Sequence, residues 1–128
     1  MSGDPSVVLL VDDEAHILSA LTRSLRREGF ELLTAQSPAE ALQVLETRRV
    51  DLVVSDQKMP GASGIDLLRE VARRHPTTPR VLLTGWPEEI PASELAASGV
   101  DAVLPKPWDD ASLKQTLRGL LAGGALAS

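Results

Sequence analysis

Cysteine is absent from the 128-residue chain, and its absence excludes several kinds of chemistry at once. Disulfide bonds, thiol nucleophiles, cysteine-based zinc sites and iron–sulfur clusters all require this residue. A chain of this length is expected to form one domain that buries about two-thirds of the surface its unfolded form exposes. Such a domain can fold without disulfide bonds or a structural metal ion. The lack of cysteine also agrees with a reducing compartment, and we expect a cytoplasmic location.

Aromatic residues are scarce, and long apolar runs and an excess of positive charge are absent. Aromatic residues make up 2% of the chain, so the core has to be aliphatic. No apolar run approaches the roughly 18 residues of a membrane-spanning helix, and we expect no membrane partner. The 13 Lys and Arg residues against 18 Asp and Glu residues give a net charge of −5. Because this charge repels nucleic acid phosphates, we expect no direct nucleic-acid partner.

Apolar segments of strand length alternate along the chain with segments of helical periodicity. We expect strands at residues 7–11, 30–34, 51–56, 80–84 and 102–104. A helix is expected after each strand, because apolar residues recur there at a spacing of three or four. Strict alternation requires right-handed crossovers and a parallel sheet. The sequence therefore predicts an α/β fold: a single-domain, doubly wound, five-stranded parallel sheet in the flavodoxin-like order 2-1-3-4-5, with helices on both faces.

The expected elements also set the domain limits. Residues 7–122 are predicted to form the domain, and residues 1–6 a short N-terminal tail. The small residues at 123–128 are expected to form a flexible tail, which we interpret as a natural end, a linker remnant or a cloning remnant.

Polar side chains lie where each central strand is expected to end. Asp12 and Asp13 follow the first strand, Asp56 ends the third, Thr84 ends the fourth, and Lys106 comes just after the fifth. In such a fold these strand ends meet at the crevice where the winding direction reverses. Two carboxylates about 4 Å apart repel each other by about 4 kcal/mol at an effective dielectric constant of about 20. The site therefore requires a cation.

The residue types at this crevice indicate which cation and which ligand fit. An oxygen-only ligand set without Cys or a nearby His favours a hard ion such as Mg²⁺ over zinc or copper. Lys106 supplies a second, fixed positive charge. A hydroxyl at Thr84 and an ammonium at Lys106 beside a metal ion suit a tetrahedral anion, for which a phosphoryl group is the natural candidate.

Four separated motifs, each at an expected strand end, resemble the receiver domain of bacterial two-component response regulators. The motifs are Val11-Asp12-Asp13-Glu14, Asp56-Gln57-Lys58-Met59-Pro60 followed by Gly64, Leu83-Thr84-Gly85, and Lys106-Pro107. The resemblance covers nearly the whole chain, from residue 7 to residue 121. Each motif also has an ordinary structural explanation, such as helix capping or a turn. Their joint occurrence at four strand ends favours a common function.

The resemblance implies a phosphorylated signalling switch that performs no metabolic turnover. It implies that Asp56 accepts a phosphoryl group from the phosphohistidine of a sensor histidine kinase or a histidine phosphotransfer protein. It further implies that Asp13, Asp56 and the backbone carbonyl of Lys58 bind Mg²⁺, with Asp12 contributing through a water molecule on the ion. The switch would then control an effector domain or a downstream protein, neither of which the sequence identifies.

The same resemblance assigns the remaining polar residues. Thr84 and Lys106 would bind the phosphoryl oxygens, and the Lys106–Pro107 peptide bond would be cis, which an X–Pro bond allows at low cost. Many members of the family have Tyr or Phe three residues before this lysine, where the present chain has Val103. We therefore expect the signal to leave through the loop after Thr84, where Trp86 offers a large contact surface. Lys58 is expected to tune the lifetime of the phosphorylated state.

Two other functions remain open at this stage. A degenerate receiver could act as a docking module without phosphorylation, although the intact acids, Thr84 and Lys106 argue against this reading. An aspartate-nucleophile phosphatase of the haloacid dehalogenase type would need Asp-x-Asp after the first strand, where this chain has Asp12-Asp13-Glu14. A nucleotide-binding function has still less support from the sequence, because no glycine-rich phosphate loop follows the first strand.

Other charged and aromatic residues have structural explanations. The arginine pairs at 26–27, 48–49 and 73–74 are each expected in the last turn of a helix, where cations interact favourably with the helix dipole. His16 and His75 lack the spacing of metal ligands, and we expect both at the surface. Trp108 is expected to pack locally.

Overall fold

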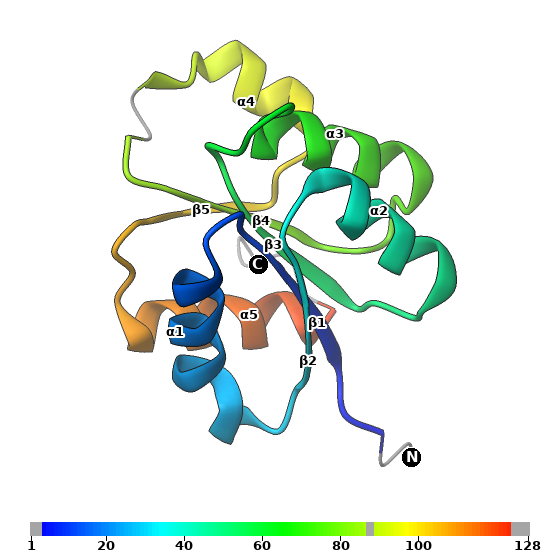
Figure 1. Cartoon of the computed structure of the whole chain (residues 1–128), viewed down its shortest axis with the longest axis vertical. Coiled ribbons are helices and arrows are strands. Elements are labelled where there is room, and N and C mark those ends of the chain that lie inside the picture. The colour runs from blue at the N-terminus through cyan, green and yellow to red at the C-terminus, as the bar shows by residue number, and fades with distance from the viewer. Residues whose placement is uncertain (1–3, 87–88, 124–128) are drawn as a thin grey trace.

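The computed structural model describes residues 4–86 and 89–123, and a five-stranded parallel sheet forms its centre (Figure 1). The strands are β1 (Val7–Val11), β2 (Glu31–Ala35), β3 (Leu52–Asp56), β4 (Arg80–Thr84) and β5 (Ala102–Pro105). The helices are α1 (Ala15–Leu25), α2 (Pro38–Thr47), α3 (Gly64–Arg74), α4 (Ala92–Ser98) and α5 (Asp110–Leu121), with a short 3₁₀ helix η1 (Arg26–Glu28) after α1. The strand order β2-β1-β3-β4-β5 and the parallel pairing confirm the predicted fold class.

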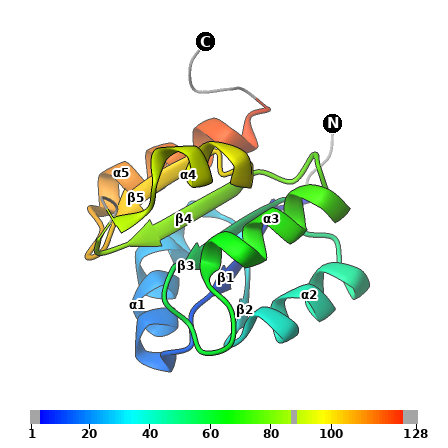
Figure 2. The same cartoon turned by 90° about the horizontal axis from the view of Figure 1, so that it is seen from above.

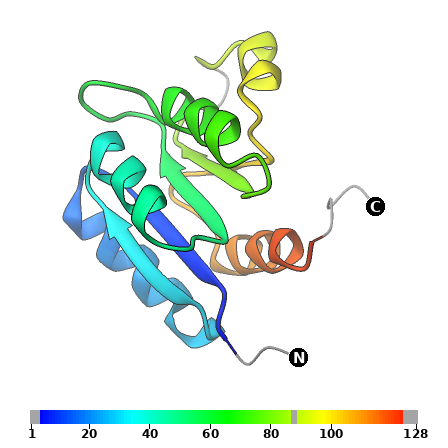
Figure 3. The same cartoon turned by 90° about the vertical axis from the view of Figure 1, so that its right-hand side faces the viewer.

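Helices cover both faces of the sheet, and alternate residues of each central strand pack against opposite layers. Figures 2 and 3 show α1 and α5 on one face and α2 and α3 on the other. Leu9 of β1 packs with the α2 and α3 layer, whereas Val8 and Leu10 pack with α1 and α5. Burial on both faces explains why β1 is an unbroken apolar run. The rigid central strands hold the polar residues at their carboxyl ends.

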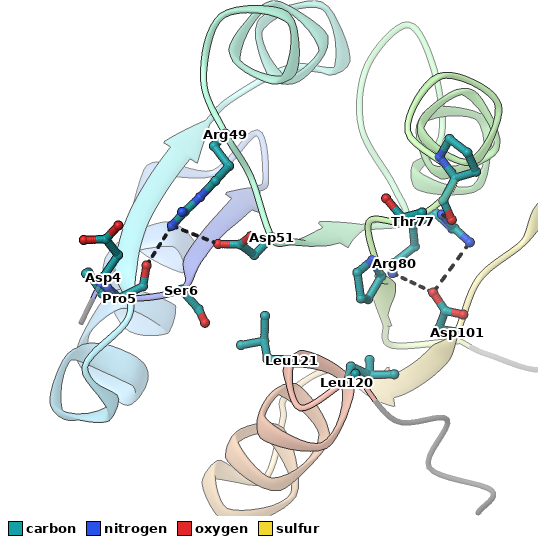
Figure 4. Close-up of a pocket in the computed structure, with 13 residues that line it drawn as sticks. Asp4, Pro5, Ser6, Arg49, Asp51, Thr77, Arg80, Asp101, Leu120 and Leu121 are labelled. Atoms are coloured by element: carbon teal, nitrogen blue, oxygen red, sulfur yellow. Dashed lines mark hydrogen bonds and ion pairs between the residues drawn. The ribbon is translucent and has the colours of Figure 1, made fainter. Parts of the chain in front are cut away.

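Two aspartates make equivalent pairs of hydrogen bonds at the opposite, amino edge of the sheet, and Figure 4 shows one of them, Asp101, bonded to Arg80. Asp51 precedes β3; its backbone N–H donates to Val7 O at 2.7 Å, and its carboxylate accepts from Val7 N at 2.8 Å. Asp101 precedes β5 and makes the same pair of bonds with Arg80, both at 2.8 Å. The two carboxylates thus accept hydrogen bonds from the first N–H groups of β1 and β4. Because Asp51 is used in this way, it lies just outside β3, which begins at Leu52, one residue later than predicted.

Several surface residues lie where the sequence predicted, and others do not. The pair 73–74 ends α3 and the pair 26–27 lies in η1, but the pair 48–49 lies beyond α2. Arg48 has an extended backbone and pairs with Glu31 of β2, so its side chain stabilises a loop rather than a helix end. His16 is exposed as expected, whereas His75 is partly buried beside Glu46, with 3.3 Å between Nε2 and Oε2.

The ends of the chain fall partly outside the described residues. The predicted tails include residues 1–3 and 124–128, which lie beyond the described ranges, so the domain limits at 7 and 122 stay predictions. Within the described ranges, Ser6 O accepts from Glu31 N at 2.8 Å and Pro5 O accepts from Arg49 Nη2 at 3.0 Å. No helix among the described residues has the length and apolar character needed to cross a bilayer.

Candidate phosphoryl and metal site

The carboxyl edge of the sheet brings together the polar residues that the sequence singled out. Asp12 and Asp13 directly follow β1, and Asp56 is the last residue of β3. Thr84 is the last residue of β4, and Lys106 follows the last residue of β5. A cavity of about 270 Å³ opens among these strand ends. Its lining residues are Asp13, Glu14, Asp56, Gln57, Lys58, Thr84, Gly85, Trp86 and Lys106.

Three carboxylates crowd this edge and differ in their exposure to solvent. One oxygen each from Asp12, Asp13 and Asp56 lie within 4.8 Å of one another. Asp12 is 1% exposed and Asp56 is 7% exposed, whereas Asp13 is more open to solvent. Asp12 Oδ1 also accepts a hydrogen bond from Glu14 N at 2.9 Å, which fixes the direction of its second oxygen. The buried acids need a positive partner, since an unpaired buried charge is very costly.

Lys106 is the positive partner that the protein itself supplies. Its Nζ donates to Asp56 Oδ1 at 2.9 Å and to Asp12 Oδ2 at 3.0 Å, so one ammonium bridges acids from two strands. Burial lowers the pKa of Lys106, but the hydrogen bonds and negative charges of Asp56 and Asp12 outweigh burial, and the net pKa lies above its ordinary value. Lys106 therefore carries its charge throughout the neutral range.

The pKa of Asp56 is raised above its ordinary value. Burial is the largest cause; the hydrogen bond from Lys106 opposes it, and the negative charge of Asp12 adds to it. The lysine therefore only partly compensates the cost of ionising this carboxyl. A second cation at the open side of the cluster, next to Asp13, would complete the compensation. Carboxylate oxygens without any Cys or His among them match the ligand preference of Mg²⁺, so the residues present fit such an ion.

Thr84 holds its position through two neighbouring backbone contacts. The Thr84 carbonyl accepts from Lys106 N at 3.1 Å, and its hydroxyl oxygen accepts from Trp86 N at 3.1 Å. An added Cβ at Gly85 would lie 3.4 Å from the Lys106 carbonyl oxygen, which is an ordinary van der Waals contact, so this arrangement does not itself require glycine. The Lys106–Pro107 peptide bond is cis, as the family resemblance implied. The hydroxyl proton of Thr84 remains available to a ligand, since the oxygen acts as acceptor toward Trp86.

The loop after β3 folds back on Asp56 through Gln57 and Gly64. Gly64 N donates to Gln57 O at 2.8 Å, and Ile65 N donates to Gln57 Oε1 at 2.9 Å. A Cβ at Gly64 would lie 2.1 Å from the Asp56 carbonyl oxygen, so only glycine allows this approach. The sequence motif included both Gln57 and Gly64 but assigned no role to Gln57, because that role depends on a contact between a loop and the first turn of α3.

Lys58 and Trp86 lie on the rim of the cavity. Lys58 Nζ is 3.6 Å from Glu89 Oε1 and 6.0 Å from the centre of the Trp86 ring system. Trp86 is 55% exposed, although the large apolar residues of the core are buried. The Lys58 ammonium therefore points toward the loop after β4, whereas Lys106 is the lysine that contacts Asp12 and Asp56. Sequence reasoning missed Glu89, since nothing in the local sequence links it to Lys58.

Two further predicted positions can be placed. Val103, where many receivers have an aromatic ring, is partly buried and packs against the core layer of α2 and α3. Trp108 packs inward against the layer of α1 and α5, and its Nε1 donates to Ser24 Oγ at 3.1 Å. The packing of Trp108 was expected, but its partner lies far away in the sequence.

Comparison with known proteins identifies what the chain resembles. Residues 8–118 match the family described as the response regulator receiver domain. The transcriptional regulatory protein GlrR of Escherichia coli K12 is 37% identical over 128 residues, which are all of this chain and 29% of GlrR. The chain therefore spans less than a third of that relative.

Solved structures show the same architecture. The signal receiver domain of an HD domain-containing protein from Pseudomonas fluorescens Pf-5 superposes with a TM-score of 0.87 at 34% identity, covering 96% of this chain and 91% of that one. The response regulator TrrA of Thermotoga maritima, in complex with Mg²⁺ and BeF, has a TM-score of 0.82 at 31% identity, covering 90% of this chain and 98% of that one.

Proposed function

Because the chain belongs to the response regulator receiver domain family, we propose that Asp56 accepts a phosphoryl group from a phosphohistidine and thereby switches the conformation of the domain. Response regulators receive their signal from sensor kinases. The donor proposed here is accordingly a sensor histidine kinase or a histidine phosphotransfer protein. The domain acts as a switch that is set and reset, and it turns over no metabolite.

The bridging position of Lys106 is the observation that carries this proposal. One ammonium contacts both Asp12 and Asp56 at hydrogen-bond distance, at the mouth of a small polar cavity. A carboxylate is a competent nucleophile toward phosphorus, and phosphoryl transfer mainly requires positioning and neutralisation of negative charge. Lys106 supplies such neutralisation beside the attacking group. A lysine that merely balanced surface charge would not need to be held by two buried acids.

We assign a Mg²⁺ site to the same acids. Asp13, Asp56 and the backbone carbonyl of Lys58 would hold the ion, with Asp12 close by. The ion would supply Lewis-acid neutralisation of the phosphoryl charge. The mutual distances of the carboxylate oxygens and the all-oxygen ligand set support this assignment. The Mg²⁺ and BeF complex of TrrA, a structural relative, is consistent with it.

In the transfer step, an Asp56 carboxylate oxygen attacks phosphorus as the bond from phosphorus to the donor nitrogen breaks. Lys106 moves part of its hydrogen bonding from Asp56 Oδ1 to a phosphoryl oxygen, and it keeps its contact with Asp12. The Thr84 hydroxyl donates to another phosphoryl oxygen. Each of these contacts offers the new group a charge-assisted partner, which is what lets it bias a conformational equilibrium.

The conformational signal leaves through the loop after β4. The Thr84 hydroxyl oxygen accepts a hydrogen bond from Trp86 N, which lies in that loop. A movement of the Thr84 side chain toward a phosphoryl group would therefore change the position of Trp86. Val103 offers no aromatic ring that could carry the signal toward β5 instead. The effector domain or downstream protein that reads the change is unidentified. The cytoplasmic location and the absence of nucleic-acid and membrane partners stay predictions.

Incubation with Mg²⁺ and a small phosphodonor tests the proposal. We expect one phosphoryl group per chain, released by hydroxylamine as an acyl phosphate should be, and no adduct in Asp56→Asn. Glu94→Gln, which removes an exposed acid outside the acid cluster, is the matched control and should still be labelled. A docking module would give no adduct in the parent protein, and a phosphatase would consume donor continuously. Either result would overturn the proposal.

A further inference from the structure

Trp86 is an unusual residue on the rim of a polar cavity. It is the large apolar side chain that stands exposed among the described residues, at 55%, while the aliphatic residues of similar bulk are buried. It lines the same cavity as Asp56, Thr84 and Lys106. Exposed aromatic surface has a hydrophobic cost unless a partner covers it. A ring at the entrance to the acceptor site is placed to meet whatever carries the phosphoryl group.

The backbone of Trp86 is bonded to the end of β4, and the face of its ring attracts positive charge. Its backbone N–H donates to the Thr84 hydroxyl oxygen at 3.1 Å, which ties it to the end of β4. Lys58 Nζ lies 6.0 Å from the ring centre, at the outer limit of a cation–π contact, and is also drawn toward Glu89 at 3.6 Å. The ring is therefore incompletely covered by its own lysine, and a flat cation could stack on it at shorter range.

A phosphorylated imidazole has the chemistry to do so. When one ring nitrogen carries the phosphoryl group and the other carries a proton, the ring is flat, aromatic and positively charged. Such a ring can stack offset on an indole and gain cation–π attraction as well. Asp13 and Glu14 line the same cavity and favour positive charge at its entrance. Donors without a ring, such as phosphoramidate and acetyl phosphate, gain none of this stacking.

We propose that Trp86 determines the donor preference of the site by stacking on the imidazole of a phosphohistidine donor while Asp56 takes its phosphoryl group. This inference rests on the function proposed above. In the step, the phosphorus–nitrogen bond breaks and a bond from phosphorus to an Asp56 oxygen forms. The electron pair of the broken bond stays on the ring nitrogen. Because the other nitrogen already carries a proton, the ring leaves as neutral imidazole, and its cation–π attraction to Trp86 ends.

The test compares donors that share the bond but differ in the ring. Phosphoimidazole and phosphoramidate both transfer across a phosphorus–nitrogen bond, and acetyl phosphate serves as a donor with neither ring nor nitrogen. Second-order rate constants of adduct formation are measured with Mg²⁺ by intact-protein mass spectrometry. We expect Trp86→Leu to lower the ratio of the phosphoimidazole rate to the phosphoramidate rate about two- to fivefold. Trp86→Phe keeps a ring and should retain more of the ratio.

The experiment includes one matched control variant, and two results would contradict the proposals. Trp108→Phe changes the other tryptophan, which packs away from the cavity, and should leave the ratio as in the parent. An adduct that forms in every variant with an unchanged or increased ratio in Trp86→Leu would overturn the inference and leave the proposed function standing. No adduct in the parent with any donor would instead overturn the proposed function, and the inference with it.

Discussion

Replacing Lys106 with methionine removes the charge that holds the acid cluster together. The ammonium lies 2.9 Å from Asp56 Oδ1 and 3.0 Å from Asp12 Oδ2, so at an effective dielectric constant of about 20 each attraction is worth roughly 5–6 kcal/mol before desolvation. Desolvation of the ammonium, which methionine avoids, cancels much of this. Removing one partner of a buried ion pair costs about 3–5 kcal/mol overall. Because the Lys106 side chain is 20% exposed, we expect the lower end, about 3 kcal/mol.

Urea unfolding at pH 7 without divalent ions measures this cost. The raised pKa of Lys106 means that its contribution is fully present below the ordinary pKa of 10.5 and is lost only as pH rises through the higher folded-state value, so pH 7 captures all of it. Lys114→Met is the matched control, because Lys114 Nζ is 3.9 Å from Glu28, is 34% exposed, and leaves Glu28 paired with Arg118. It should cost less than about 1 kcal/mol.

A double-mutant cycle isolates the pair itself. In an Asp56→Asn background the cluster has one negative charge fewer, so Lys106→Met should cost clearly less than in the parent. A Lys106→Met variant as stable as the parent, or one whose loss of stability is the same with and without the Asp56 charge, would contradict this expectation. Either outcome would mean that Lys106 is an ordinary solvated lysine.

Three further predictions concern the surroundings of this cluster. Gly64→Ala should destabilise the fold by about 1–3 kcal/mol in urea unfolding, because the added Cβ meets the Asp56 carbonyl oxygen at 2.1 Å; an unchanged midpoint would contradict this. Mg²⁺ at ten times its dissociation constant should raise the free energy of unfolding by about 1.4 kcal/mol, measured by thermal unfolding, and should change the fluorescence emission of Trp86. Asp13→Ala should abolish both responses. Lys58→Ala should speed the decay of the adduct, because the ammonium and the Trp86 ring flank the cavity entrance; decay as slow as in the parent would exclude a shielding role.

The fold was predictable because its signals are local in sequence. Continuous apolar runs of strand length and period-3.6 patterns identify the strands and helices, and right-handed crossovers then leave few ways to arrange them. A parallel sheet brings its carboxyl ends to one edge, which is why Asp12, Asp56 and Lys106 could be expected to meet although up to 94 residues separate them. Their proximity follows from topology, and needs no knowledge of side-chain contacts.

The residue roles that could not be predicted from the sequence depend on contacts across loops. Gln57 acts through its bond to Ile65, and Glu89 through its pairing with Lys58, and neither contact follows from periodicity. The pair of hydrogen bonds between Asp51 and Val7 could not be predicted either, since an aspartate beside a strand resembles an ordinary turn residue in the sequence. Such contacts depend on loop conformation, which local propensities leave open.

Chemical identification of the phosphorylated residue decides whether Asp56 is the acceptor. Borohydride reduces an aspartyl phosphate to homoserine, and peptide mass spectrometry then identifies the altered position. After reaction with Mg²⁺ and phosphoimidazole, we expect homoserine at position 56 and unmodified aspartate at positions 12 and 13. Reduction at either of those positions, or a phosphoryl group found on His16 or His75 instead, would contradict the assignment of Asp56 as the acceptor.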